Sequence, residues 1–179
     1  DASIPPSGLT ITGVTANGTG CAPGTTTTTI SPDGQNFTVT PTAFNGTVAA
    51  AGGSLAVKDC LLSIQVANPN NQRYGLEALH LRGTAKVGAG ANLVISSNYY
   101  FQGAPVGEGA QETSIDGPYD QPLDITHNWG ETSPLSSCSA ERLLNASVRF
   151  RLRNGTPATD GSFNLSSLGE VTFRVRPCE

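Results

Sequence analysis

Apolar and polar residues alternate along most of the chain. A period of two places apolar side chains on one face of a strand and polar side chains on the other. Glycine and proline, 21 and 12 of the 179 residues, separate these segments and disfavour helices. The pattern predicts about ten short strands in an all-β fold, a single-domain antiparallel β-sandwich of the jelly-roll or Ig-like kind. The clearest alternating segments are residues 9–12, 37–40, 62–66, 75–87, 93–101, 144–153 and 171–176.

Turn signals stand between the alternating segments. Residues 68–71, with the sequence Asn-Pro-Asn-Asn, predict a strong turn. Asn17, Asn45 and Asn154 are each followed by glycine, and this pair favours a tight turn because both residues tolerate positive φ. Residues 22–29 form a threonine-rich run of low complexity, but no linker-like shift in composition divides the chain.

Charge and hydropathy exclude some classes of partner. The chain has 10 basic and 14 acidic residues, whereas a nucleic-acid-binding protein usually carries a clustered basic excess. No apolar run approaches the ~20 residues of a membrane helix, so we expect no membrane partner. We expect residues 1–19 to form an N-terminal extension or edge strand, and residues 20–179 a single β-sandwich domain. The start at Asp1 and the absence of Met indicate a mature form without its targeting segment.

Four cysteines, Cys21, Cys60, Cys138 and Cys178, suggest two disulfides. None belongs to a Cys-x-x-Cys pair and no histidine lies near them, so we expect neither a metal nor a cofactor. Four cysteines allow three pairings. We favour Cys21–Cys60 with Cys138–Cys178, because each bridge closes a loop of similar length around locally paired strands.

Six Asn-x-Ser/Thr sequons make N-linked glycans an expected modification. Together with an even number of cysteines and no Met, they favour an oxidising secretory route. We therefore expect a secreted protein, either extracellular or associated with the cell wall. The sequons begin at Asn17, Asn36, Asn45, Asn145, Asn154 and Asn164.

Catalytic motifs are absent from the sequence, and we name no catalytic residue. His80 and His127 are the two histidines, and Asp124 lies three residues before His127, a spacing that does not place the two face to face in a strand. No Gly-x-Ser-x-Gly elbow or His-Glu-x-x-His pair occurs. Two alternatives to a binding protein remain: a hydrolase that uses an acidic loop at residues 116–127, and a protease inhibitor that presents a loop at residues 103–117.

Arginines gather on two of the predicted strands. Arg149, Arg151 and Arg153 share one face of the first, and Arg174 and Arg176 share one face of the second. If the strands are neighbours, the five guanidinium groups share an outer face that can bind an anionic polymer through forked hydrogen bonds. The alternatives are a solvated face whose arginine stems cover apolar surface, or a face paired with the acidic loop.

Aromatic residues are candidates for stacking on sugar rings. Tyr100 points opposite to Tyr99 and Phe101 in an alternating strand, and Tyr119 and Trp129 lie in a region expected to be rich in loops. For Trp129 the alternative is packing in the core.

The cysteine framework and a Tyr-Tyr-Phe-x-Gly motif at residues 99–103 resemble those of secreted fungal proteins grouped as domain of unknown function 4360. This resemblance implies a secreted, disulfide-bonded, β-rich protein of fungal type, and it implies no catalytic residues. The similar segments are residues 20–25, 31–34, 37–44, 58–60, 82–83, 96–103, 117–120, 138, 144–145 and 178.

These observations favour a non-catalytic carbohydrate-binding or matrix-associated protein, with an extracellular polysaccharide as its partner. The hydrolase and the protease inhibitor are the competing interpretations, and the oligomeric state stays open. The expected binding residues are Tyr100, Tyr119, Trp129, Arg149, Arg151, Arg153, Arg174 and Arg176.

Overall fold

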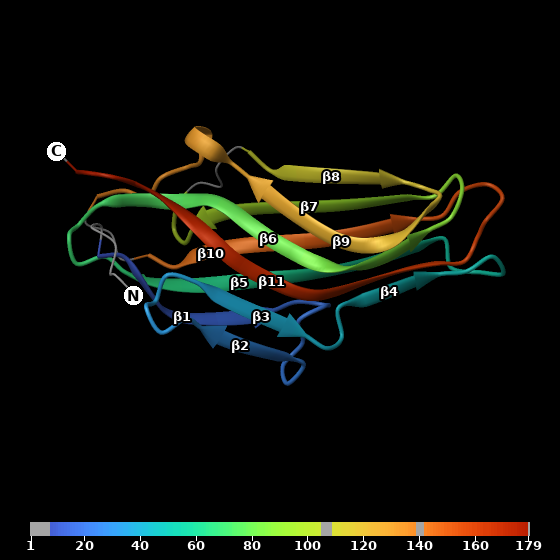
Figure 1. Cartoon of the computed structure of the whole chain (residues 1–179), viewed down its shortest axis with the longest axis horizontal. Coiled ribbons are helices and arrows are strands. Elements are labelled where there is room, and N and C mark those ends of the chain that lie inside the picture. The colour runs from blue at the N-terminus through green and yellow to red at the C-terminus, as the bar shows by residue number, and fades with distance from the viewer. Residues whose placement is uncertain (1–7, 105–108, 139–141, 179) are drawn as a thin grey trace.

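Two antiparallel sheets pack face to face in the computed structural model, which describes residues 8–104, 109–138 and 142–178 (Figure 1). Within these residues the chain forms eleven strands and one short 3-10 helix, η1 (Gly130–Thr132), and no helix long or apolar enough to cross a membrane. The predicted all-β sandwich is confirmed. The strands are β1 (Thr10–Asn17), β2 (Thr26–Ile30), β3 (Phe37–Pro41), β4 (Asn45–Val48), β5 (Leu55–Ala67), β6 (Arg73–Val87), β7 (Asn92–Phe101), β8 (Gln111–Asp116), β9 (Tyr119–Asn128), β10 (Leu144–Arg153) and β11 (Gly161–Arg176).

The two sheets differ in size and in their central strands. The five-stranded sheet has the order β1-β5-β10-β7-β8, and the six-stranded sheet has the order β2-β3-β11-β6-β9, with β4 also paired to β11. Strands β5, β6 and β11 span 13, 15 and 16 residues, longer than the short strands that the alternation predicts. β11 changes its register against β6 at three places, one of them beside Glu170, whose φ is 49°.

The core lies between the sheets and follows the period of two. On β10 alternate residues from Leu144 to Leu152 are fully buried, while the residues between them face outward. Phe150 packs edge-on against Phe44 from the β3–β4 connection, with 5.1 Å between ring centroids. Burying one such side chain contributes about 1.5–3 kcal/mol, so inward packing of β10 fixes which of its residues face solvent.

Some of the predicted turns are present in the structure, and one is not. Residues 68–71 connect β5 to β6, and Asn17 ends β1 before a turn, as expected. Asn154 begins the longer connection between β10 and β11. The turn predicted at Asn45 is wrong, because Asn45 and Gly46 are the first residues of β4. Gly46 is needed there for another reason, since a Cβ atom would lie 2.6 Å from the ring of Phe163.

Both predicted disulfides are confirmed. Cys21–Cys60 joins the β1–β2 connection to β5, and its two cysteines are 0% and 1% exposed. Cys138–Cys178 joins the segment before β10 to the segment after β11 near the surface. No free cysteine occurs in the part of the chain that the structure describes.

The N-terminal segment contributes a strand to the sandwich. β1 pairs with β5 at the edge of the five-stranded sheet, and Leu9 and Ile11 are buried in the core. The division of the chain into residues 1–19 and 20–179 stays a prediction.

Candidate functional site

The outer face of the five-stranded sheet carries three of the predicted binding arginines. Arg149, Arg151 and Arg153 alternate along β10, the central strand of this sheet, and all three are exposed. They face outward because Val148, Phe150 and the other inward residues of β10 are buried. We call these three residues the arginine face. Neighbours along the row are about 6.6 Å apart, two residues along a strand.

The residues beside the arginine face mix charge with apolar surface. Val57 and Val94, both half-buried, flank Arg151, and Leu55, 50% exposed, lies opposite Arg153. Directly opposite residues in antiparallel strands have Cβ atoms about 4.5–5.5 Å apart, so the guanidinium groups rise above a partly apolar floor. This floor is also what the arginine stems would cover if the face binds no ligand.

Nearby carboxylates are largely engaged elsewhere. Oδ1 of Asp59, opposite Arg149, accepts hydrogen bonds from the Thr19 amide at 2.9 Å and the Thr19 hydroxyl at 3.0 Å. Oδ1 of Asp116 accepts from Asn92 at 2.8 Å. Among the described residues, the three guanidinium groups form neither a hydrogen bond nor an ion pair.

Glu112 is the acidic residue that shares a hollow with the arginine face. It lies on β8, and it lines a small pocket of about 160 Å³ together with Arg149, Arg151, Val94 and Ser96. Two cations and one carboxylate leave this pocket with a net positive charge, which suits an anionic group on a ligand.

Tyr100 lies on the same outer face as the three arginines. It is half-buried, while Tyr99 and Phe101 on either side of it are 0% and 5% exposed. Its cross-strand partner Asn145 lies four residues before Arg149 on β10, which is about 13 Å along the strand. The structure therefore places Tyr100 and the arginine face on one surface.

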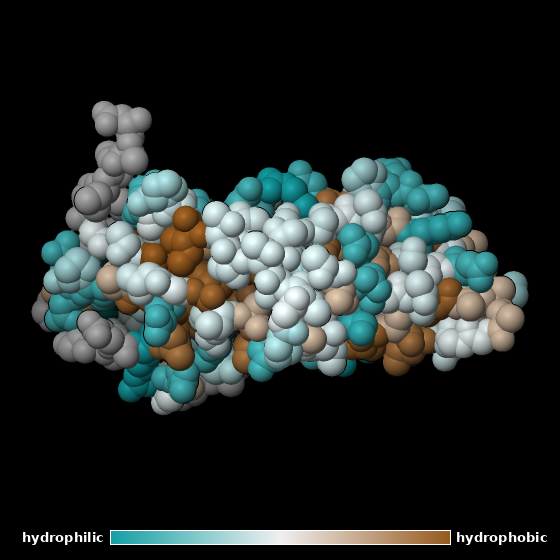
Figure 2. Space-filling view, turned by 90° about the horizontal axis from the view of Figure 1, so that it is seen from below, coloured by the Kyte–Doolittle hydropathy of each residue, from teal (hydrophilic) through white to brown (hydrophobic). Residues whose placement is uncertain are grey.

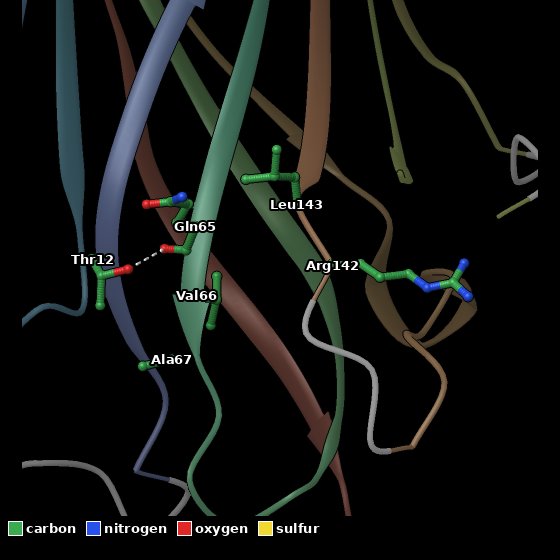
Figure 3. A pocket seen from close by; sticks show the side chains of 6 residues that line it. All are labelled: Thr12, Gln65, Val66, Ala67, Arg142 and Leu143. Atoms are coloured by element: carbon green, nitrogen blue, oxygen red, sulfur yellow. Dashed lines mark hydrogen bonds between the residues drawn. The ribbon is translucent and has the colours of Figure 1, made fainter. Parts of the chain in front are cut away.

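A second pocket, of about 350 Å³, lies at the other end of this sheet (Figure 3). β10 begins at Leu144 opposite Ile64, so the last residues of β5 pair only with β1 and leave a notch. In the notch the Thr12 hydroxyl donates to the Gln65 carbonyl at 3.4 Å, and the Arg142 side chain points away from the other labelled residues. No charged side chain is directed into the notch from its labelled lining. The lining residues are Thr12, Gln65, Val66, Ala67, Arg142 and Leu143.

The expected face of five arginines is wrong, because β10 and β11 belong to different sheets. Arg174 is half-buried and donates to the Ser133 carbonyl at 3.0 Å, so it supports the segment after η1. Arg176 is exposed on the six-stranded sheet. Neither residue can act together with the arginine face.

Trp129 and Tyr119 also lie away from the arginine face. Trp129 is 4% exposed, its Nε1 donates to the Gly109 carbonyl at 2.6 Å, and its ring packs edge-on against Tyr99. The alternative of core packing therefore applies to Trp129, and its ring is closed to a sugar. Tyr119 packs partly against the core and donates to the Pro122 carbonyl at 2.8 Å.

The acidic loop expected at residues 116–127 is instead the last residue of β8, a short turn and most of β9. Asp124 faces outward, 3.7 Å from Arg82, whereas His127 on the same strand faces the core. Asp124 and His127 therefore lie on opposite faces of β9 and do not form a pair. Within the described ranges, no group of three or more His, Cys, Asp or Glu residues is placed to hold a metal. The loop expected of a protease inhibitor includes residues 105–108, which lie outside the described residues.

A buried polar cluster, which the sequence analysis missed, links the two sheets. His127 Nδ1 forms a hydrogen bond with the Ser97 hydroxyl from β7, and its Nε2 lies 3.0 Å from the Thr113 hydroxyl from β8. Burial lowers the pKa of His127, so its ring is neutral at neutral pH. Ser97 is 2% exposed, and a substrate cannot reach it. The signal in the sequence was a polar residue at an inward position of a predicted strand.

The sequons divide by exposure. Asn17, Asn45 and Asn164 are exposed. Asn145 is 5% exposed and its amide oxygen accepts from Ser63 at 2.9 Å, so its burial disfavours the glycan expected there, which stays a prediction.

Two further sequons have restricted side chains. Asn154 Nδ2 donates to the Thr159 carbonyl at 2.9 Å and to the Ala49 carbonyl at 3.3 Å, so a glycan would disturb its loop. Asn36 is half-buried.

Fold and site together define a disulfide-bonded β-sandwich with a row of three exposed arginines on one outer face. The chain belongs to the family described as Domain of unknown function (DUF4360), which matches residues 7–178 and confirms the resemblance seen in the sequence. An uncharacterized secreted protein from Arthroderma benhamiae is 30% identical over 152 residues, which are 82% of this chain and 60% of the relative. The chain thus spans about three fifths of that relative's length.

Solved structures resemble the chain only distantly. TmCBM61, solved in complex with beta-1,4-galactotriose, is 8% identical with a TM-score of 0.37, and 91% of each chain is covered. A Broad Bean Stain Virus structure is 17% identical with a TM-score of 0.31, covering 87% of this chain and 91% of the viral chain. The tailspike protein 4 of bacteriophage CBA120 is 14% identical with a TM-score of 0.30, covering 94% of this chain and 19% of the tailspike.

Proposed function

We propose that the protein is a secreted, non-catalytic polysaccharide-binding protein whose arginine face holds an anionic polysaccharide. The row of unpaired guanidinium groups on the central strand of the five-stranded sheet carries this proposal. Arginine binds carboxylate and sulfate groups through forked hydrogen bonds, and a row at a regular spacing suits a polymer with repeated acidic groups.

Apolar surface beside the charges favours a sugar polymer over a small inorganic anion. Leu55, Val57 and Val94 lie beside the arginines on the neighbouring strands. Sugar rings present C–H groups as well as polar groups, so a carbohydrate can contact both parts of this surface. Tyr100 extends the same surface toward the start of β10.

Secretion is supported by three observations. The two disulfides fit an oxidising compartment, three sequons are exposed, and the relative from Arthroderma benhamiae is described as secreted. The secreted protein would then bind its polysaccharide in the extracellular matrix or the cell wall.

Affinity electrophoresis in gels that contain polygalacturonate tests this proposal. We expect the wild-type protein to be retarded, and the retardation to decrease with salt because exposed charges are screened. The variant Arg149→Gln/Arg151→Gln should bind at least about tenfold more weakly, since each lost charge-assisted hydrogen bond costs about 1.5–3 kcal/mol.

The matched control is Lys86→Gln/Arg176→Gln, which removes the same charge from the other sheet. We expect this control to bind as the wild type does. If both variants bind equally weakly, net charge explains the binding and the arginine face has no specific role. If the Arg149→Gln/Arg151→Gln variant is retarded as strongly as the wild type, the role of the arginine face is refuted. Dextran, which is neutral, should not retard any of these proteins.

A further inference from the structure

The outermost strands of the two sheets differ in how well they are protected against pairing with another chain. An outermost strand exposes unpaired backbone groups, and charges, proline or bulges usually block them. β8 carries Glu112 and Asp116, and β9 carries Pro122 and Asp124. At these two edges, carboxylate charges or the missing N–H of proline therefore disfavour pairing with a second strand.

β1 is protected by a different feature. Its register shifts between Ile11 and Gly13, and the Ile11 amide already donates to the Gly34 carbonyl at 2.7 Å. The edge of β1 is therefore bent, and one of its backbone amides already has a hydrogen-bond partner.

β2 has none of these features. Its five residues, Thr26–Ile30, are all β-branched and carry no charge, and its three central residues are exposed. In the side view of Figure 2, which looks from below at the edge where Figure 1 places β2, the middle of the surface is white, of intermediate hydropathy. This composition favours strand pairing and supplies nothing that repels it.

The backbone groups that β2 leaves open follow from its pairing with β3. The Thr25 carbonyl accepts from Thr42 at 2.8 Å, and the Ser31 amide donates to Asn36 at 2.8 Å, so residues 25 and 31 are bonded toward β3. Bonding alternates along an antiparallel strand. The amides and carbonyls of Thr26, Thr28 and Ile30 therefore point to the open edge. Pro41, which has no N–H, lies opposite Thr26, as this alternation requires.

We propose that β2 pairs with β2 of a second copy of this chain, antiparallel about a two-fold axis at Thr28. In this register Thr28 faces Thr28 of the second copy, and Thr26 faces Ile30 of the second copy. The three pairs form about six backbone hydrogen bonds, two for each bonded pair. A charged edge strand would meet its own charge near such an axis, whereas the uncharged β2 is complementary to itself.

The dimer is closed and limited in length. Each copy uses the same edge, so the contact is isologous and does not propagate into a fibre. Pro23 and Pro32 stand on either side of β2 and stop the pairing beyond it. A contact of this size predicts a weak, concentration-dependent dimer.

Sedimentation velocity of the full chain over a concentration series tests the proposal. Thr28→Pro removes an amide that points to the open edge and spares the bonds to β3, so we expect the dissociation constant of the dimer to rise at least about tenfold. Thr28→Val keeps the shape and the amide and is the matched control, with an expected change of less than about twofold. Circular dichroism checks that both variants are folded.

Hydrogen exchange of the wild-type protein gives an independent measurement. The amides of Thr28 and Ile30 should gain protection as the concentration rises, while those of Thr27 and Thr29 stay protected at every concentration. A monomer at all concentrations, or a dimer that Thr28→Pro leaves intact, overturns the proposal. If Thr28→Pro does not fold, exchange at Thr28 that is independent of concentration overturns it in the same way.

Discussion

Side chains of one residue type take different roles according to the face on which they lie. Arg151 faces outward from the centre of a sheet without a partner among the described residues, while Arg174 is half-buried and bonds to a carbonyl. His80 lies on the outer face of β6, 3.1 Å from the Thr126 hydroxyl, while His127 is buried between the sheets. The chemistry of each residue therefore depends on its place in the pleat.

Buried His127 predicts a specific dependence of stability on pH. Its pKa in the folded protein is lowered from 6.5 by burial, so the unfolded chain binds a proton more readily. The contribution of neutral His127 is complete above pH 6.5 and is lost as the pH falls from there toward the lowered pKa. The slope is at most about 1.4 kcal/mol per pH unit for one proton.

Denaturant unfolding between about pH 5.5 and 7.5 measures this slope, both limits being about one pH unit from the ordinary histidine pKa. We expect His127→Gln to flatten it, and His80→Gln to keep the wild-type slope because that side chain lies on an outer face. A slope that His127→Gln leaves unchanged would contradict the assignment.

At the scale of elements, alternation located strands that bury apolar side chains, including the start of β1 at the edge of its sheet, and missed β2 and β8. β10 buries every second residue, and its limits match the alternating segment. β2 and β8 have no fully buried residue, so polar residues such as Thr113 are tolerated at inward positions and the period of two is weak. These strands form because a neighbour offers backbone partners, which local sequence does not reveal.

Loop length and burial predict different contributions from the two disulfides. Their sequence separations are 39 and 40 residues, so each restricts the unfolded chain by about 4 kcal/mol in the chain-entropy description. Cys21 and Cys60 also pack in the core, and their removal leaves a cavity. We expect Cys21→Ala/Cys60→Ala to lose more stability than Cys138→Ala/Cys178→Ala.

Urea unfolding of the two double variants makes this comparison. An equal loss would show that packing around Cys21 and Cys60 adds nothing to the bridge. A larger loss for the Cys138 pair would contradict the expectation.

At the scale of the whole molecule, sequence could predict the sandwich but not which strands adjoin. Alternation correctly predicted that Arg149, Arg151 and Arg153 face one way. It could not predict that β5 and β7, rather than β11, lie beside β10, because that choice depends on long-range pairing. The shared face of Arg149, Arg151 and Arg153 was therefore predicted, and its extension to Arg174 and Arg176 was wrong, while ligand binding by these residues stays a prediction.

Exposure in the folded molecule predicts which sequons carry glycans. For protein secreted by a eukaryotic host, we expect glycans on Asn17, Asn45 and Asn164 and none on Asn145, whose side chain is enclosed. Enzymatic release in heavy-oxygen water followed by peptide mapping marks each formerly glycosylated asparagine. The control Asn145→Gln should leave the glycan pattern unchanged, and a glycan on Asn145 of the folded protein would contradict the expectation.

The packing of the two sheets places the arginine face and two exposed sequons on opposite outer faces of the molecule. The arginine face looks outward from one layer, and Asn45 and Asn164, opposite each other on β4 and β11, look outward from the other layer. A molecule adsorbed through its cationic side onto a negatively charged surface would therefore turn any sugar chains on Asn45 or Asn164 toward the surrounding medium. Immobilised molecules would share one orientation, set by which residues of β10 and β11 enter the core.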